Sequence, residues 1–128
     1  MKVEISVAIE ELKHQFHLST FNIREDEQGG AYVIMEPLEI SEKFQPNETW
    51  VGFQIPAQYP YADIYPIFIG GDVKRVDGRA FEAPVTNGHS FEGRTAIQVS
   101  RRSSATQNGM QKATSKILKV LDFLEKLQ

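Results

Sequence analysis

The segment from residue 55 to residue 66, Ile-Pro-Ala-Gln-Tyr-Pro-Tyr-Ala-Asp-Ile-Tyr-Pro, limits the possible folds of this chain more than any other part. Pro56, Pro60 and Pro66 fall within eleven residues. Each proline lacks a backbone donor and fixes φ, so the segment fits neither a helix interior nor the middle of a sheet. We therefore expect this proline corner (residues 55–66) to be a stiff, extended linker whose aromatic side chains pack on a sheet.

Before the corner, the apolar pattern predicts a helix and then strands. Ile5, Ile9, Leu12 and Phe16 recur at helical spacing, which predicts a helix over residues 5–17. A turn with two glycines at residues 25–30 separates two predicted strands and indicates a hairpin. Four strands are predicted in all, over residues 20–24, 31–40, 51–55 and 67–69. Pro37 lies in the second of them, so that strand should be bent or at a sheet edge.

After the corner, residues 72–88 show no clear period and are predicted to be irregular. Met110, Ala113, Ile117, Leu121 and Leu124 form an apolar stripe that predicts a closing helix over residues 109–127, with its lysines on other faces. The expected architecture is a single α+β domain, residues 1–128, in which a four-stranded antiparallel meander is flanked by an N-terminal and a C-terminal helix.

Composition narrows the chemistry. The chain of 128 residues has no cysteine, which excludes disulfides, thiolate metal ligands and thioesters. Its three histidines have no paired acidic ligands, so we expect no metal and no cofactor. No basic stripe is interleaved with aromatic residues, and no apolar run is long enough to cross a bilayer. We expect a cytoplasmic protein that binds neither nucleic acid nor membrane.

Residues 89–103 are the stretch in which reactive groups are expected. An apolar-alternating run that includes Ile97 and Val99 leads directly into Ser100-Arg101-Arg102-Ser103. Such an arrangement brings polar groups from a rigid strand to a surface rim. Alternation places Ser100 on the face opposite Ile97 and Val99.

The corner and its flanks resemble a known family. Phe53-Gln54-Ile55-Pro56, Tyr59-Pro60-Tyr61 and Pro66-Ile67-Phe68-Ile69 are similar to the strand-Pro, Tyr-Pro-Phe and Pro-strand pattern of the ubiquitin-conjugating enzyme fold and of its noncatalytic relative, the RWD domain. Residues 97–103 ahead of a helix are similar to a diverged bacterial group of conjugating-enzyme-like proteins. The resemblance implies two partners, an activating enzyme and a ubiquitin-like protein, and a transfer of that modifier to a target amine.

The family's nucleophile is a cysteine, and two positions in this chain stand where it would be. Ala96, in Gly-Arg-Thr-Ala-Ile, looks like the family's Gly-x-Ile-Cys-Leu turn and would then be a replaced cysteine. Ser100 follows His89 by eleven residues, close to the family's separation between histidine and cysteine. A serine would carry the modifier as an oxyester, with His89 as the base and Arg101 and Arg102 stabilising the oxyanion.

Other interpretations stay open. Ser103 is an alternative nucleophile to Ser100, and a cysteine at position 96 would restore the usual thioester chemistry. The chain is also interpretable as a catalytically inactive module of the conjugating-enzyme or RWD type. In that case Tyr59, Pro60, Tyr61 and Pro66 of the corner, together with the first helix, would bind a partner protein.

Overall fold

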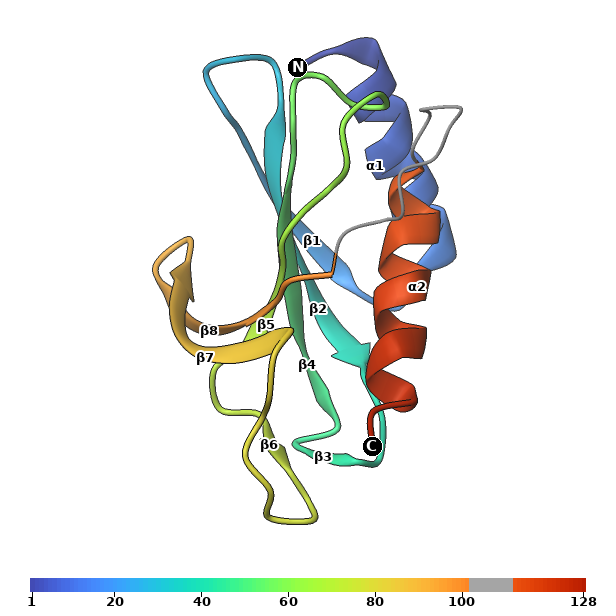
Figure 1. Ribbon diagram of the computed structural model, residues 1–128. Coiled ribbons are helices and arrows are strands. Elements are labelled where there is room, and N and C mark those ends of the chain that lie inside the picture. Colours follow the sequence, from blue (N-terminus) through green and yellow to red (C-terminus); the bar gives the residue numbers. More distant parts are fainter. Residues whose placement is uncertain (102–111) are drawn as a thin grey trace.

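The computed structural model describes residues 1–101 and 112–128, which fold as an α+β arrangement (Figure 1). Helix α1 spans Val3–Gln15 and helix α2 spans Ala113–Glu125, close to the two predicted helices. Ile5, Ile9 and Leu12 of the predicted stripe are buried, and Phe16 packs against the same core. Met110, the first residue of the second predicted stripe, lies outside the described residues.

The strands are more numerous than predicted. They are β1 (Thr20–Glu25), β2 (Ala31–Glu39), β3 (Phe44–Gln45), β4 (Glu48–Ile55), β5 (Ile67–Gly70), β6 (Lys74–Arg75), β7 (Val85–Phe91) and β8 (Arg94–Val99). Among the described residues, six form one antiparallel sheet in the order β1-β2-β4-β5-β8-β7, and β3 pairs with β6. The prediction of a four-stranded meander was therefore wrong in strand number. Residues 72–88 were predicted to be irregular, which holds for 76–84 but not for β6 or for the first four residues of β7.

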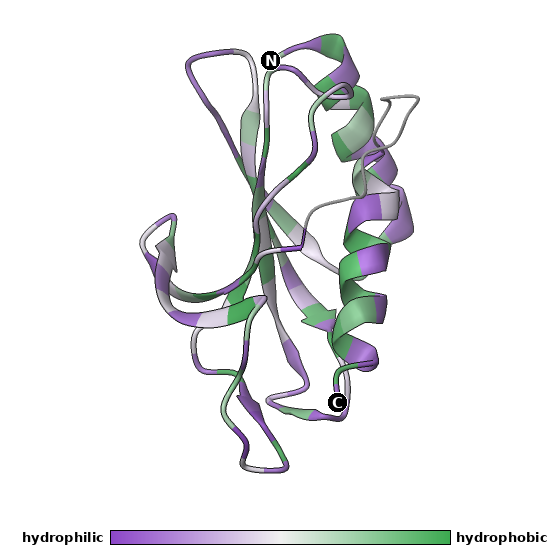
Figure 2. Cartoon of the chain, viewed as in Figure 1, coloured by the Kyte–Doolittle hydropathy of each residue, from purple (hydrophilic) through white to green (hydrophobic). Residues whose placement is uncertain are grey.

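Both helices cover one face of the sheet, which we call the inner face (Figure 1). Figure 2 shows apolar and polar residues alternating along both helices, as expected when one side of a helix is buried. The core between helices and sheet is mostly aliphatic, with Phe53 and Phe44 as its fully buried aromatic rings. Strand side chains alternate between faces, so Ile97 and Val99 of β8 point into this core.

The proline corner links β4 to β5 without helix or strand, as predicted, but it contains turns and is not extended throughout. One of its aromatic residues is a structural anchor. The Tyr59 ring is buried, and its hydroxyl accepts a hydrogen bond from the Ala113 backbone N–H at 3.1 Å. This bond satisfies an otherwise unpaired donor at the start of α2. Pro37 coincides with a register shift in β2 between Met35 and Leu38, but β2 pairs with strands on both sides and is not an edge.

The other face of the sheet, the outer face, is covered by the β7–β8 hairpin, which curves away from the helices (Figure 1). Its two-residue turn, Glu92-Gly93, has positive φ at both positions, 49° and 81°, as a type I′ turn requires. Phe91, just before the turn, stacks on Phe68 at 4.9 Å between ring centroids and on Trp50 at 6.2 Å. Gly52 lies directly beneath this ring, where an added Cβ would come within 2.6 Å of Phe91. The outer-face cluster consists of Tyr32, Ile34, Trp50, Phe68, Phe91 and Ala96.

Two arginine–carboxylate pairs hold the hairpin tip against the far side of the sheet. Arg24 of β1 donates two hydrogen bonds to Glu92, at 2.7 and 2.8 Å. Arg94 of β8 donates two to Glu36 of β2, at 3.0 and 2.9 Å. The two guanidiniums also lie over Tyr32 and Trp50, respectively. An edge hairpin thus reaches back to the opposite edge of its own sheet, and we call these two ion pairs the latch.

Candidate functional site

Ser100 lies immediately after β8, at the point where the chain leaves the sheet. Its backbone N–H donates to the Pro84 carbonyl at 2.8 Å, which fixes the serine against the residue before β7. Its half-buried hydroxyl oxygen accepts a hydrogen bond from Gln98 Nε2 at 2.6 Å. Gln98 and Ser100 are two residues apart on the strand and share a face, as the alternation predicts.

This bond has a chemical consequence. The amide of Gln98 donates to Ser100 Oγ, so the oxygen keeps its own hydrogen for transfer. A fixed donor aimed at an oxygen stabilises the negative charge that develops there as the proton leaves. Ser100 is therefore a held hydroxyl with one stabilising partner.

His89 does not reach Ser100. Across the β7–β8 pair His89 lies opposite Ala96, while Val85 lies opposite Val99. Four residues along a strand correspond to roughly 13 Å, beyond any direct hydrogen bond. The His89 Nε2 instead lies 2.9 Å from the Thr86 hydroxyl, across a register shift between these two residues.

Ala96, the other predicted nucleophile position, is 2% exposed. It pairs with Gly70 of β5 and belongs to the outer-face cluster with Ile34 and Phe91. A side chain at this position faces the packed underside of the hairpin. A cysteine there would be reached only after the hairpin lifts from the sheet.

Of the two arginines that follow Ser100 in the chain, the structure describes only Arg101. The Arg101 guanidinium lies 4.7 Å from the centroid of Phe123 on α2, and so is drawn toward the helix. Arg102 and the alternative nucleophile Ser103 lie outside the described residues. The Arg101 guanidinium is therefore directed to α2, whereas the Ser100 hydroxyl shares the other face with Gln98, and His89 lies apart from both.

Lys116 of α2 was predicted to lie away from the apolar stripe of its helix, and this prediction was wrong. It is buried, and its ammonium donates to the Arg101 carbonyl at 2.7 Å and to Asp63 of the proline corner at 3.1 Å. Burial lowers the pKa of Lys116, and the bond to Asp63 opposes this shift. The spacing could have indicated this burial, because Lys116 follows the buried Ala113 by three residues and so lies on the same side of the helix. This lysine joins the corner, the helix and the segment after Ser100.

Of the corner residues predicted to bind a partner, Tyr61 is the accessible one, with 73% of its surface exposed. Tyr59 is buried against α2, and Pro60 and Pro66 are half-buried. Within the described ranges, no three histidine or acidic side chains gather as a metal ion would need. Neither helix there has the length and apolar character of a membrane span.

The described chain thus combines two helices, an antiparallel sheet, a proline corner and a strand that ends next to the Ser100 hydroxyl. A family model described as prokaryotic E2 family E matches residues 12–127, nearly the whole chain. The chain belongs to this family. A conjugating-enzyme-like role follows, together with partners of the activating-enzyme and ubiquitin-like classes in general. No curated protein and no solved structure gives a significant match.

Proposed function

We propose that this protein accepts a ubiquitin-like modifier from an activating enzyme as an ester on Ser100 and passes it to a target amine. The observation that carries the proposal is the hydrogen bond from Gln98 to the Ser100 hydroxyl, at the end of the strand to which the sequence resemblance assigns the nucleophile. The backbone bond to Pro84 holds that hydroxyl in one position. Position and a stabilising donor are what a weak nucleophile requires.

The proposed transfer has two steps. Ser100 Oγ bonds to the carbonyl carbon of the activated modifier C-terminus while the bond from that carbon to its leaving group breaks, and the hydroxyl proton departs with that group. The target amine then attacks the ester carbonyl, the bond from carbon to Ser100 Oγ breaks, and the oxygen takes a proton from the amine. Gln98 stabilises the serine oxygen in both steps, and the exposed Arg101 lies next to it in the chain.

The test combines the chain with its activating enzyme, its modifier and ATP. We expect a hydroxylamine-sensitive adduct that Ser100→Ala abolishes and that becomes thiol-sensitive in Ser100→Cys. Gln98→Ala should slow adduct formation by about fivefold, because the donor that stabilises the developing charge on Ser100 Oγ is lost. Ser90→Ala is the matched control, since Ser90 is exposed on the same hairpin.

The outcomes separate the open alternatives. An adduct that survives Ser100→Ala and disappears in Ser103→Ala would move the nucleophile to Ser103. No adduct with any variant would reject covalent transfer. A retained adduct in both variants would point to a residue that this proposal does not include.

A second candidate function, noncovalent binding of a partner protein, is favoured by one specific observation. Ala96 is covered by the hairpin and His89 is engaged by Thr86, so the two positions closest to the family's active-site pattern are unavailable. In that case Tyr61→Ala should weaken binding of the activating enzyme in calorimetry, whereas Ser100→Ala should not. Val76→Ala, which also removes an exposed apolar side chain, is the control.

A further inference from the structure

A cavity of about 280 Å³ opens between the segment after β5 and strand β7. Its lining combines small residues, apolar side chains and cations: Gly71, Val73, Lys74, Arg75, Gly78, Arg79, Ala80, Phe81 and Asn87. Phe81 stacks on the buried Phe44, which fixes one apolar wall. The cavity is small, at the lower limit of sites that hold small molecules, and fits a group the size of one or two amino acids.

Charge distinguishes this basic cavity from two larger cavities of the described chain. Three of its lining residues are basic and none is acidic, although the whole chain has a net charge of −3. Two larger cavities, each about twice its volume, have the opposite character. They are lined by Glu36, Glu48 and Asp72 with Arg94, and by Glu39, Glu42 and Glu125 with Lys43. A local positive potential of this kind attracts anions to one place on an acidic protein.

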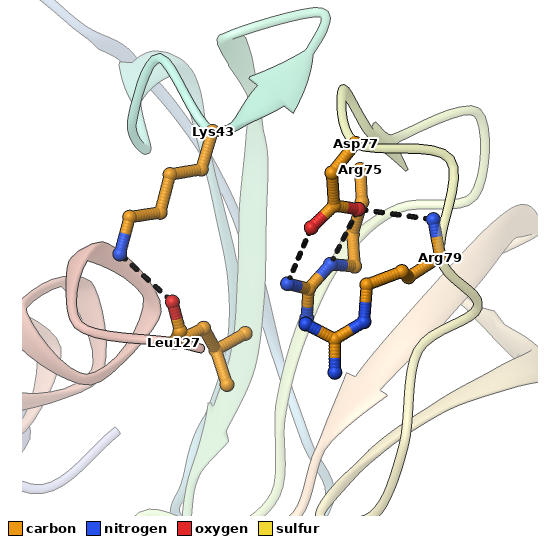
Figure 3. A network of polar contacts seen from close by, with 5 residues as sticks. All are labelled: Lys43, Arg75, Asp77, Arg79 and Leu127. Atoms are coloured by element: carbon orange, nitrogen blue, oxygen red, sulfur yellow. Dashed lines mark hydrogen bonds and ion pairs between the residues drawn. The ribbon is translucent and has the colours of Figure 1, made fainter.

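The Asp77 carboxylate holds the Arg75 guanidinium and the backbone of Arg79. Arg75, whose side chain is 10% exposed, donates from Nε and Nη2 to Asp77 at 3.1 and 2.8 Å. The Arg79 backbone N–H donates to the same carboxylate at 2.9 Å. Figure 3 shows the Arg79 side chain extending back toward Arg75 from the other side of this turn. The bond from Arg75, followed by the one from Arg79, lowers the pKa of Asp77 to about 2, so the carboxylate stays ionised and the turn stays closed.

The charge balance identifies the ligand class. Arg75 is matched by Asp77, and the next carboxylate that acts on it is Glu82. Within residues 1–101 and 112–128, neither Lys74 nor Arg79 takes part in an ion pair. The surplus is therefore one to two positive charges, which suits a carboxylate better than a phosphate dianion. The Asp77 contact leaves both hydrogens on Arg75 Nη1 and the second hydrogen on Nη2, and one hydrogen from each nitrogen forms the fork that a carboxylate accepts.

We propose that the basic cavity binds a carboxylate of a polypeptide, either a C-terminal carboxylate or an Asp or Glu side chain, through Lys74, Arg75 and Arg79. The site is separate from Ser100 and does not depend on transfer chemistry. It gives the chain a means of holding an acidic or C-terminal segment of a partner. The interaction is charge-assisted and therefore weakens with added salt.

The test is an NMR titration of the intact protein, followed at the Gly78 backbone amide. The probes are acetyl-Ala-Ala-Ala with a free C-terminus, the same peptide amidated, amidated acetyl-Ala-Glu-Ala, and inorganic phosphate. We expect Gly78 to shift with the free C-terminus, with the internal Glu, or with both, and not with the neutral amidated peptide. Lys74→Gln combined with Arg79→Gln should weaken binding about tenfold or more.

The control variant combines Lys119→Gln with Lys13→Gln, which removes the same charge from the exposed sides of α2 and α1. The proposal requires the control to bind like the wild type. Equal loss in the control would mean unspecific attraction and would overturn the site. Equal binding of the neutral peptide, or tighter binding of phosphate than of either carboxylate, would also overturn it. Both double variants keep Arg75 and Asp77, so the turn that shapes the cavity is preserved.

Discussion

The two faces of the sheet are covered by different means. The inner face is covered by α1 and α2, with an aliphatic core; in the described chain its ion pairs, Lys116 with Asp63 and the N-terminal ammonium with Glu25, lie at its margins. The outer face is covered by the sheet's own edge hairpin, through stacked aromatic rings and the latch. Two helices are enough to cover one face of a six-stranded sheet. The chain covers the other by curling β7 and β8 back over it.

This difference matters for the proposed site, because β8 has side chains in the inner core and in the outer-face cluster. Its first residue, Arg94, is part of the latch, and the serine that follows its last residue is the candidate nucleophile. Ile97 and Val99 meanwhile point into the inner core. A change on either face therefore acts on the strand that positions Ser100, but the two faces should respond with different magnitudes.

The largest effect is expected on the inner face. Phe53 is fully buried, and Phe53→Ala should lower the free energy of unfolding by about 3–5 kcal/mol, because it removes apolar contact and leaves a cavity. Guanidinium unfolding followed by circular dichroism measures this. Leu118→Ala, an exposed apolar position on α2, should stay within about 0.5 kcal/mol of the wild type. Similar losses in the two variants would show that the inner face is not the main source of stability.

A smaller and more local effect is expected on the outer face. Phe91→Ala should lower the free energy of unfolding by about 2–3 kcal/mol, less than Phe53→Ala, because Phe91 keeps 8% of its surface exposed and belongs to a smaller cluster. Trp50, which stacks on Phe91, should show red-shifted fluorescence while the far-ultraviolet spectrum is unchanged. Gly52→Ala should give the same red shift, since its Cβ would displace the Phe91 ring. Unchanged Trp50 emission in both variants would contradict the hairpin as the outer cover.

The sequence predicted the inner face better than the outer one for a physical reason. Apolar periodicity reports burial under a neighbouring layer, and it located both helices and the strands beside the proline corner. Strand β7 was not predicted because its interior, Thr-Asn-Gly-His-Ser, is polar and shows no apolar alternation, which an edge strand permits. The latch joins Arg24 to a residue 68 positions away, and no local pattern encodes such a pair.

The candidate site was predictable in part. The alternation of β8 predicts the face on which Ser100 lies, whereas His89 was proposed as its base only from its separation along the chain. Counting back from the turn at Glu92-Gly93, which pairs Phe91 with Arg94, would have placed His89 opposite Ala96 and away from the serine. Gln98 could have been found by the same alternation, two residues before Ser100. Burial of Lys116 depends on how α2 sits on the corner, which composition does not determine.

The smallest effect concerns the latch. Hydrogen bonds from Arg94 and Arg24 lower the pKa of Glu36 and of Glu92, respectively, below the ordinary value of 4.5. Carboxylates with a depressed folded-state pKa stabilise the fold above their unfolded pKa, and this contribution is lost as the pH falls through the folded value. The hairpin should therefore loosen only below pH 4.5, and Trp50 fluorescence should follow it.

Replacing the carboxylates tests this directly. Glu36→Gln should cost about 0.5–1 kcal/mol at neutral pH, because the pair is partly exposed. Glu36→Gln combined with Glu92→Gln should remove the acid transition of Trp50 fluorescence and reproduce its low-pH emission at pH 7. Glu10→Gln, which breaks an exposed pair on α1, should leave that transition in place. If the double variant still shows the transition, another acidic group controls the hairpin, and the outer face is held by its aromatic contacts rather than by the latch.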